Sequence, residues 1–390
     1  MKIGLIGACD RNNFGDLLMP IIFENQYKYN NANRNDIEFA YYGQAKSKMD
    51  YLKSKNTDAL KDCYNNCDID IIVGGEVLTS NYKLMYFNLQ KNSLKILLLR
   101  CLNKIFPNFI EKLSRQRLEG KEHKPWILDK EKLNCKKLIY NTVGGHIDTK
   151  DLENIKKVDY MSIRNNYDYQ NIKEINKNVK LYPDSVISIS KIIKDEEIFD
   201  NTEKDIKEFT KNKYFIIQID NRDSKGLIKK IGNQINRICN KYSIDCILLP
   251  IGYAQGHEDQ KALKRILKYC NNSKVKMPRV TNIYETIYIL KNAEVFIGTS
   301  LHGIIVSTSY EVPHIVLTDK IKKLLNYIDT WPSTPIKYTK AESIYENFVK
   351  IYQNEEVKNN LIQYKEKLIE LANENFENIN KIINEVYENE

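Results

Sequence analysis

No apolar run in this sequence approaches the roughly 20 residues that a membrane-spanning helix requires. The apolar run at the N-terminus ends at Asp10 after a single lysine. It is too short for a signal peptide, and we interpret it as a buried first strand. With 42% hydrophobic and 28% charged residues, the chain does not have the composition of a disordered protein either. These absences predict a soluble globular protein of the cytoplasm.

Metal-binding and disulfide patterns are also absent from the sequence. The eight cysteines are scattered without C-x-x-C spacing, and most lie in apolar stretches, so we expect reduced core thiols. Aspartate, glutamate and histidine are not clustered at the spacing of metal ligands, and we therefore predict no metal site. The net charge of +9 is moderate and most of it lies in one segment, which argues against nucleic acid as a partner.

What the sequence does contain is an alternation of short β-branched or aromatic runs with longer helical patterns. This alternation is typical of parallel strands joined by crossover helices. A length of 390 residues, at about 150 per domain, leaves room for two domains. We therefore predict an α/β fold with two Rossmann-like domains. The predicted strands span residues 2–7, 37–42, 70–73, 137–143, 159–163 and 179–182, and then 214–219, 245–250, 275–280, 294–297 and 314–317.

The predicted N-terminal domain covers residues 1–186 and the C-terminal domain residues 212–335, with the polar segment 187–211 as their junction. From Ala341 onward the chain contains no glycine or proline, and apolar residues recur at helical spacing. Residues 336–390 are therefore expected to form C-terminal helices. These helices either cross back to the N-terminal domain or form a cap on the C-terminal domain alone.

The turn after the first predicted strand contains Asn13, Phe14, Gly15 and Asp16. In doubly wound sheets, ligands bind beyond the carboxyl ends of the strands, where backbone N–H groups and a helix dipole favour an anion. The turn proper has one glycine and differs from the dinucleotide-binding pattern, so it does not indicate NAD. A binding loop and an ordinary turn both remain open for these residues.

Two glycine pairs follow two other predicted strands of the same sheet. Gly74 and Gly75 precede Glu76 after one strand, and Gly144 and Gly145 follow another. Paired glycines at strand ends indicate that the backbone closely approaches a neighbouring group. With the first turn they place three loops along one rim, as a ligand cleft requires, although such glycines also let helices pack tightly.

The strongest local pattern is a predicted strand that ends in glycine and is followed by Thr299, Ser300 and His302. Small and apolar residues then begin a helix, which places His302 at or near the helix N-terminus. There the helix dipole disfavours a charged imidazolium unless an anion is bound, so the histidine is suited to proton transfer to an anionic substrate. The alternative is a histidine that only caps the helix.

Arg164 directly follows the predicted strand at residues 159–163. From the carboxyl edge of the sheet, its guanidinium can reach a cleft between the domains and bind a carboxylate or phosphate with two nitrogens. Surface arginines are common, so the position alone also allows a residue without a special role.

Together these motifs resemble the polysaccharide pyruvyl transferase family. The resemblance covers residues 2–329 and implies a glycosyltransferase-B-like fold, in which two Rossmann-like domains face each other across a cleft. It rests on the order and spacing of five short pieces: Asn13-Phe14-Gly15-Asp16, Gly74-Gly75, Ser162-Ile163-Arg164-Asn165, Pro183-Asp184 and Leu301-His302-Gly303.

The family transfers a pyruvyl group from phosphoenolpyruvate to a sugar as a cyclic ketal. The resemblance therefore implies a transferase that acts on a bacterial surface-polysaccharide precursor, for a capsule or exopolysaccharide, with phosphoenolpyruvate as donor and no cofactor. The acceptor is expected to be a saccharide or a lipid-linked saccharide. His302 would be the catalytic general acid that protonates the donor carbon, and Arg164 would hold the phosphate or carboxylate.

One departure from the family pattern concerns the donor site, because Ser300 stands where the family has an arginine before Leu-His. A milder departure is Asn165, where the family usually has aspartate. Lys320 or Lys323 on a neighbouring loop can supply the missing charge. Alternatively, the enzyme is a glycosyltransferase of the same architecture that uses a nucleotide-activated sugar, or the protein binds saccharide without catalysis. All three readings stay open at this point.

Residues 88–124 combine positive charge with apolar side chains. They contain nine lysines and arginines against three glutamates, a net charge of 9 − 3 = +6. Leucine, isoleucine and phenylalanine are interleaved with these charges, as in helices that lie among anionic lipid headgroups. The segment thus indicates peripheral contact with the inner face of the membrane. The alternative is a helix buried against the sheet, with its basic residues in solvent.

Overall fold

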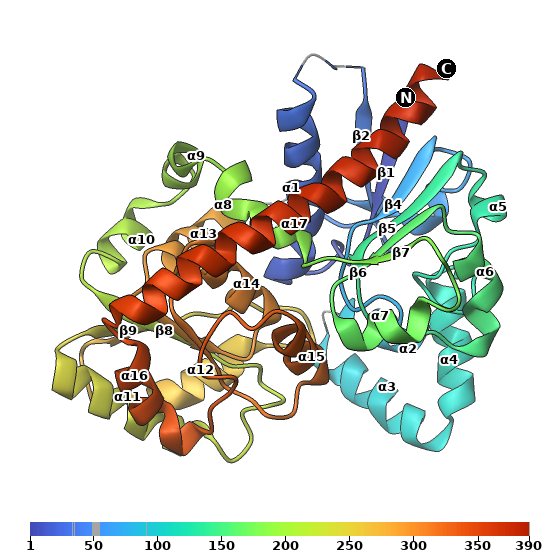
Figure 1. Ribbon diagram of the computed structural model, residues 1–390. Helices are drawn as coiled ribbons and strands as arrows, with labels where there is room; N and C mark the ends of the chain where they lie inside the picture. The colour runs from blue at the N-terminus through green and yellow to red at the C-terminus, as the bar shows by residue number, and fades with distance from the viewer. Residues whose placement is uncertain (33, 35, 49–54, 91, 390) are drawn as a thin grey trace.

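The structure, a computed structural model, describes residues 1–389 except 33, 35, 49–54 and 91. The strands of these residues form two sheets, one in each half of the chain (Figure 1). The first sheet contains β1 (Lys2–Ile6), β2 (Glu38–Gly43), β3 (Asp58–Ala59), β4 (Ile69–Ile72), β5 (Lys137–Val143), β6 (Tyr160–Ile163) and β7 (Val179–Leu181). The second contains β8 (Tyr214–Gln218), β9 (Asp245–Leu248), β10 (Val275–Lys276), β11 (Val295–Gly298) and β12 (His314–Val316).

Both sheets follow the same plan. The strand order is β3-β2-β1-β4-β5-β6-β7 in the first and β10-β9-β8-β11-β12 in the second, and every neighbouring pair is parallel. In each sheet the chain starts inside, builds outward to one edge and then continues on the other side of the first strand, as in Rossmann-like domains. The predicted α/β class with two Rossmann-like halves is confirmed.

All eleven predicted strands are present, ten of them with ends within two residues of the predicted ones. Every residue of β4 and of β8 is buried, as expected for parallel strands that are covered on both faces. The prediction for residues 275–280 is too long, because β10 has only two residues. The two-residue strand β3 was not predicted, since a strand this short has no alternation pattern.

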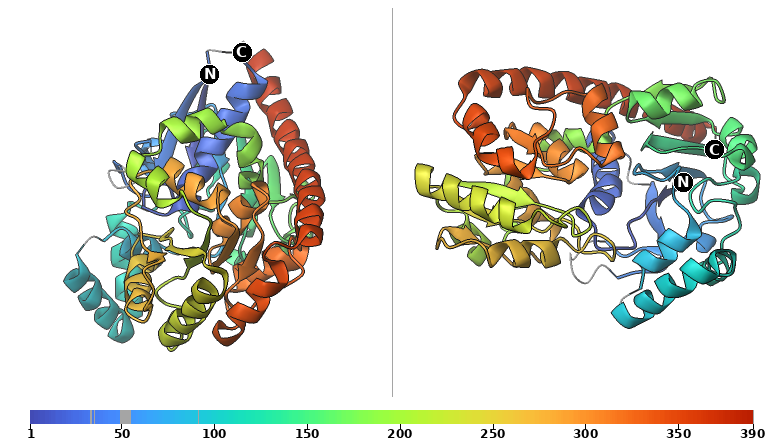
Figure 2. Two further views of the ribbon diagram at one scale, coloured as in Figure 1. Left: turned by 90° about the vertical axis from the view of Figure 1, so that its left-hand side faces the viewer. Right: turned by 90° about the horizontal axis from the view of Figure 1, so that it is seen from below.

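Helices connect the strands and surround both sheets (Figures 1 and 2). Those of the first half are α1 (Phe14–Asn30), α2 (Tyr82–Asn88), α3 (Ser93–Ile105), α4 (Pro107–Arg117), α5 (Lys130–Leu133), α6 (Leu152–Lys156) and α7 (Asn166–Ile172). Those of the second half are α11 (Ile228–Tyr242), α12 (Asp259–Leu267), α13 (Ile283–Lys291), α14 (Leu301–Ser309) and α15 (Lys322–Thr330). Short 3₁₀ turns lie at η1 (Leu60–Asp62), η2 (Thr149–Asp151), η3 (Ser185–Ser188) and η4 (Ala341–Ser343).

The predicted junction at residues 187–211 forms short helices that pack into the core. Its residues Ile187 and Ile198 belong to a hydrophobic cluster that also contains Ile3 of the first sheet and Phe296 of the second. The junction thus contributes residues to a core that both halves share, and the predicted domain boundaries stay predictions. Its helices are α8 (Ile189–Ile192), α9 (Asp195–Asp200) and α10 (Lys204–Phe209).

The C-terminal part forms a short helix and one long helix. The long helix runs from the second half across to the first (Figure 1). On it, Asn375 accepts a hydrogen bond from the Tyr160 hydroxyl at 2.9 Å and donates one to Asn141 Oδ1 at 2.8 Å. The C-terminal residues thus lie against the first sheet, which is the crossing arrangement. The two helices are α16 (Ile344–Ile351) and α17 (Glu355–Glu388).

Candidate active site

A cleft of about 520 Å³ lies at the carboxyl ends of strands from both sheets. The first half lines it with residues from the loops that follow β1, β4 and β6, and the second half with residues from the loops that follow β8, β9, β11 and β12. Open α/β sheets bind their ligands at this edge, next to the point where the strand order reverses. The cleft is therefore the candidate active site.

Nine of the residues predicted to form the site line this cleft. They come from five separate segments of the sequence, and folding brings them to one surface. They are Asn13, Asp16, Gly75, Glu76, Arg164, Thr299, Ser300, His302 and Lys323.

The other six predicted residues lie behind the wall of the cleft or away from it. Phe14 is a buried core residue, and Gly74 packs beside the Met19 side chain with φ +129°. Lys320 is exposed, so of the two lysines suggested as substitutes for the family arginine only Lys323 reaches the cleft. The six are Phe14, Gly15, Gly74, Gly144, Gly145 and Lys320.

His302 lies in the first turn of α14. Ser300 is the N-cap of this helix, and its hydroxyl accepts a hydrogen bond from the Gly303 N–H at 3.1 Å, so His302 does not cap the helix. Nε2 of His302 lies 3.6 Å from Oδ2 of Asp184, slightly beyond hydrogen-bond distance. Among the described residues it has no hydrogen-bond partner.

Helix α1 of the first half packs directly against the same imidazole. A Cβ atom at Gly15 would lie only 1.8 Å from Nδ1 of His302. Any side chain at this position would therefore displace the histidine, and glycine is the residue that permits so close an approach. Gly15 thus lies behind the cleft as the contact between the first motif and His302.

Arg164 is buried at the cleft and is paired with two carboxylates. Its Nη1 lies 3.0 Å from Oδ2 of Asp184, and its Nη2 lies 2.9 Å from Oε2 of Glu76. Burial lowers the pKa of the guanidinium, but the two carboxylates outweigh burial and raise this pKa. The side chain is only 3% exposed. The two-nitrogen contact expected for a ligand is therefore made to the protein's own acidic groups.

Asp184 connects Arg164 with His302 and is fully buried. Burial raises the pKa of this carboxyl, but His302 and Arg164 outweigh burial and lower the pKa from 3.8 to about 2. Asp184 is therefore ionised at neutral pH, and its charge lies between two potential cations. The sequence pattern assigned no site role to this residue, although Pro183-Asp184 contributed to the family resemblance.

The lowered pKa of Asp184 predicts a measurable effect on acid stability. A carboxyl whose pKa is lower in the folded state adds stability above its unfolded pKa, and that stability is lost as the pH falls through the folded value. The free energy of unfolding of the wild type is therefore expected to fall as the pH is lowered from about 5 to about 2. In Asp184→Asn this fall should be smaller by roughly 2 kcal/mol. Urea unfolding across this pH range measures the difference. Parallel pH curves for the two proteins would contradict it.

Lys323 is a cation of the cleft without a direct partner. It lies near the start of α15, after β12. Within the described part of the chain it makes no hydrogen bond or ion pair. Burial lowers the pKa of its ammonium group, and the charge of Arg164 lowers it further. An anion bound in the cleft would relieve both effects.

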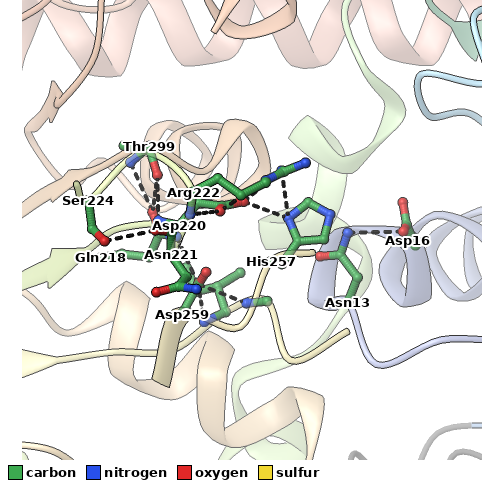
Figure 3. A network of polar contacts seen from close by, with 12 residues as sticks. Asn13, Asp16, Gln218, Asp220, Asn221, Arg222, Ser224, His257, Asp259 and Thr299 are labelled. Atoms are coloured by element: carbon green, nitrogen blue, oxygen red, sulfur yellow. Dashed lines mark hydrogen bonds and ion pairs between the residues drawn. The ribbon is translucent and has the colours of Figure 1, made fainter. Parts of the chain in front are cut away.

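The second half contributes a polar network around Asp220 (Figure 3). Oδ2 of Asp220 lies 2.9 Å from Nδ1 of His257 and 2.7 Å from Nη2 of Arg222. The Asp220 N–H donates to the Thr299 hydroxyl at 3.1 Å. Burial raises the pKa of Asp220, but hydrogen bonds from His257 and Arg222 lower it to about 2. An ionised aspartate thus orients His257 in the cleft.

The first motif also joins the two halves of the molecule. The carbonyl of Asn12 accepts hydrogen bonds from the N–H groups of Tyr253 and Ala254, both at 2.9 Å. Asn13 forms an isolated antiparallel bridge with Gly252. The loop after β1 is therefore fixed to the loop after β9, and both loops line the cleft.

Sequence reasoning missed several polar residues of the cleft. Asp220 directly follows a predicted strand, and the same position at a strand end identified Arg164, so this signal could have found it. His257 has no such signal, because its place in the cleft depends on how the loop after β9 packs. The missed residues include Arg11, Gln218, Asp220, Arg222, His257 and Asp259.

Two groups of described residues could hold a metal ion, and neither lies in the cleft. Their spacing in the sequence did not predict them as groups, and the absence of a metal site stays a prediction. In the first group, Cys63, Cys67 and Asp70 are buried together, and the Cys63 thiol donates a hydrogen bond to Asp70 at 2.9 Å.

The second group consists of His123, Asp148 and Asp151. Here Nζ of Lys124 lies 3.1 Å from Asp148 and 3.5 Å from Asp151. The protein's own ammonium group is therefore already paired with both carboxylates and offsets part of their charge.

Two Rossmann-like halves with a common cleft define a glycosyltransferase-B-like protein, and solved structures share this fold. UDP-GlcNAc 2-epimerase from Neisseria meningitidis, bound to UDP-GlcNAc, has a TM-score of 0.57 at 12% identity, covering 98% of this chain and 100% of that chain. The Methanocaldococcus jannaschii enzyme has a TM-score of 0.54 at 13% identity, covering 98% and 99%. S. aureus MnaA with UDP has a TM-score of 0.54 at 8% identity, covering 92% and 90%.

The family model of polysaccharide pyruvyl transferases matches residues 148–320. This part of the chain contains Arg164, Asp184 and His302, which the structure places in contact around one end of the cleft. No curated protein matches the chain by sequence. The resemblance recognised from the sequence motifs is thereby confirmed over residues 148–320, and the matched family supports a transferase.

Proposed function

We propose that this protein is a ketal pyruvyl transferase that moves a pyruvyl group from phosphoenolpyruvate to two hydroxyls of a saccharide. One observation carries the proposal: His302 lies in the cleft beside the ionised Asp184, within the segment that matches the pyruvyl transferase family. The acceptor is a saccharide precursor of a surface polysaccharide. No cofactor is needed, because the enol phosphate of the donor is already activated.

The chemistry requires one proton transfer to carbon. An acceptor hydroxyl adds to C2 of phosphoenolpyruvate while C3 takes up a proton and becomes a methyl group. Phosphate then leaves C2, and the second hydroxyl adds there to close the ketal. In sum, a saccharide diol and phosphoenolpyruvate give a pyruvyl ketal and inorganic phosphate.

His302 supplies the proton to C3 as the general acid. The Asp184 carboxylate lies 3.6 Å from Nε2 of the imidazole, and Gly15 allows helix α1 to pack directly against the ring. His257, oriented by Asp220 at 2.9 Å, accepts the proton of the attacking hydroxyl. Acid and base thus come from separate carboxylate–histidine pairs in one cleft.

The donor carries a phosphate and a carboxylate, and binding it requires positive charge. Lys323 binds one of these groups, because it is in the cleft and has no partner among the described residues. Arg164 contributes less to the positive charge that binds the donor, since Asp184 and Glu76 already neutralise the guanidinium. Lys323 therefore takes over the role of the family arginine that is Ser300 here.

Ligand-dependent thermal melting and product analysis test the proposed function. Several similar structures contain UDP or UDP-GlcNAc, so nucleotide sugars are the matched comparison ligands. We expect phosphoenolpyruvate to raise the melting temperature. We also expect mass spectrometry to find a pyruvylated saccharide among products from a panel of acceptors. A response to nucleotide sugars alone would favour a glycosyltransferase, and no response to any donor would favour a binding protein.

Replacing Lys323 by glutamine is expected to weaken phosphoenolpyruvate binding by roughly tenfold to a hundredfold, the equivalent of one charge-assisted hydrogen bond. Isothermal titration measures this change. Lys320→Gln is the matched control, because Lys320 lies three positions earlier, carries the same charge and is exposed outside the cleft. Equal donor affinity in the two variants would remove Lys323 from the donor site.

A further inference from the structure

Helices α3 and α4 form a pair at the outer end of the first half, away from its sheet (Figures 1 and 2). The pair has a small core of its own, in which Leu99 and Ile110 pack with Tyr86 of α2. The predicted alternative, a helix buried against the sheet, is therefore not what the structure contains. One face of the helix pair is therefore available for contact with a partner.

That outward face is apolar. On α3, Leu94, Leu97, Leu98 and Ile105 recur at the spacing of one helix face. Phe106 and Phe109, at the turn into α4 and in its first turn, are exposed as well. These six side chains are between 56% and 77% exposed. Monomeric soluble proteins rarely expose so many large apolar side chains in one place. We refer to these six residues as the apolar face.

The segment that carries the apolar face is also basic. Residues 92–121 contain seven lysines and arginines against two glutamates, a net charge of 7 − 2 = +5. All seven basic residues are exposed, including Lys95, Arg100 and Lys104 on α3 itself. Lys91 lies outside the described residues. Lys124 does not contribute, because it is buried and bonded to the carbonyls of Leu78 and His146.

The combination of apolar and basic residues identifies the chemistry of the partner. Interfaces between proteins are depleted of lysine, whereas a helix on an anionic bilayer buries its apolar side and keeps lysine and arginine among the headgroups. In the described part of the chain, no helix is both long and apolar enough to cross a membrane. A partner that fits these observations is therefore a membrane surface on which the helices lie.

We propose that the apolar face of α3 and α4 docks the protein on the surface of an anionic phospholipid bilayer. The position of the cleft relates this docking to the proposed activity. Helix α2 packs against α4, with Lys83 and Glu111 3.7 Å apart, and Leu84, Met85 and Asn88 of α2 line the cleft. The cleft thus begins beside the docking surface. A lipid-linked saccharide can reach it from the bilayer, and this last step rests on the proposed function.

Co-sedimentation with vesicles tests the docking without any substrate, so its result is independent of the proposed function. The full chain is mixed with phosphatidylcholine vesicles or with vesicles of roughly equal parts phosphatidylcholine and phosphatidylglycerol. We expect binding to the anionic vesicles only, and weaker binding as salt rises through the physiological range.

Two triple variants separate the charge from the apolar contact. The first variant changes the basic residues Lys95, Arg100 and Lys104 to glutamine. The second changes the apolar residues Leu97, Leu98 and Phe109 to glutamine. Each variant is expected to lower the partition onto anionic vesicles by on the order of tenfold or more. Because all six side chains are exposed, the melting temperature should stay close to that of the wild type.

Control variants remove equal charge, or one exposed aromatic ring, elsewhere. Changing Lys229, Lys241 and Lys264 to glutamine removes three exposed charges from the second half, and Phe199→Gln removes a ring that is 52% exposed. Both controls are expected to bind vesicles like the wild type. A polarity-sensitive fluorophore on Cys101, the exposed cysteine of α3, should shift to the blue on anionic vesicles.

Three outcomes would overturn the proposal. The first is equal binding to neutral and anionic vesicles, and the second is no binding to either. The third is a wild type that does not bind vesicles but is a dimer in light scattering, and that becomes a monomer in the apolar variant. The last outcome would assign the face to a second copy of this chain. Vesicle binding by a protein that shows no pyruvyl transfer would leave the docking intact and refute only the proposed function.

Discussion

Replacing His302 by alanine is expected to lower kcat by about 10²- to 10⁴-fold, the usual contribution of a general acid, and to leave the protein folded. The helix that carries His302 is capped by the Ser300 hydroxyl and does not depend on the imidazole. His302→Gln is expected to be equally inactive, because an amide can donate a hydrogen bond but cannot deliver a proton to carbon. Phosphate release with phosphoenolpyruvate and acceptor measures kcat, and thermal melting checks the fold.

His146→Ala is the matched control for this experiment. His146 is exposed and lies outside the cleft, so its loss should leave kcat unchanged. If His302→Ala kept more than about a tenth of wild-type turnover, the barrier would have risen by less than about 1.4 kcal/mol. Another group would then deliver the proton, and the role of His302 would be limited to binding.

The fold could be predicted from the sequence because its central strands are covered on both faces. Such strands appear as continuous apolar runs, and β4 and β8 are runs of this kind with every residue buried. The same reasoning failed at the edges of the sheets, where β3 and β10 have two residues each. Strands this short are held by their neighbours and leave no pattern of their own.

The candidate site could be predicted as far as it depends on strand ends. Glu76, Arg164 and His302 each follow a predicted strand directly or within a few residues, and parallel strands bring such positions to one edge. Contacts across the two halves could not be predicted, because they depend on how the halves pack. The approach of Gly15 to His302 is such a contact, and the sequence indicated only that a glycine was present there.

The charges at the site show the same limit: the sequence indicates which residues are charged, and only the structure shows which groups they pair with. The sequence identified Arg164 as a cation beside the cleft, and the structure shows that its charge is matched by Asp184 and Glu76. An arginine in this environment keeps two carboxylates ordered. Among the described residues that line the cleft, Lys323 carries a positive charge without an ion-pair partner, and the sequence offered it only as one of two substitutes.

The buried position of Arg164 leads to the largest expected effect on stability. Arg164→Ala is expected to lower the free energy of unfolding by about 3–5 kcal/mol, because the substitution leaves the fully buried Asp184 charge without its main partner. Urea unfolding at neutral pH measures this loss. Adding Asp184→Asn in the same chain should recover part of the stability, since the double variant no longer buries an unpaired charge.

Arg222→Ala provides a matched control, because Arg222 is also paired with an aspartate but its side chain is 57% exposed. Removing this largely exposed guanidinium should cost about 1 kcal/mol. The buried Asp220 keeps its contact with Nδ1 of His257 at 2.9 Å, so this variant should lose much less stability than Arg164→Ala. If Arg164→Ala were as stable as Arg222→Ala and instead lost affinity for phosphoenolpyruvate, the guanidinium would act on the donor directly. The ion pairs with Asp184 and Glu76 would then be contacts that the bound donor replaces.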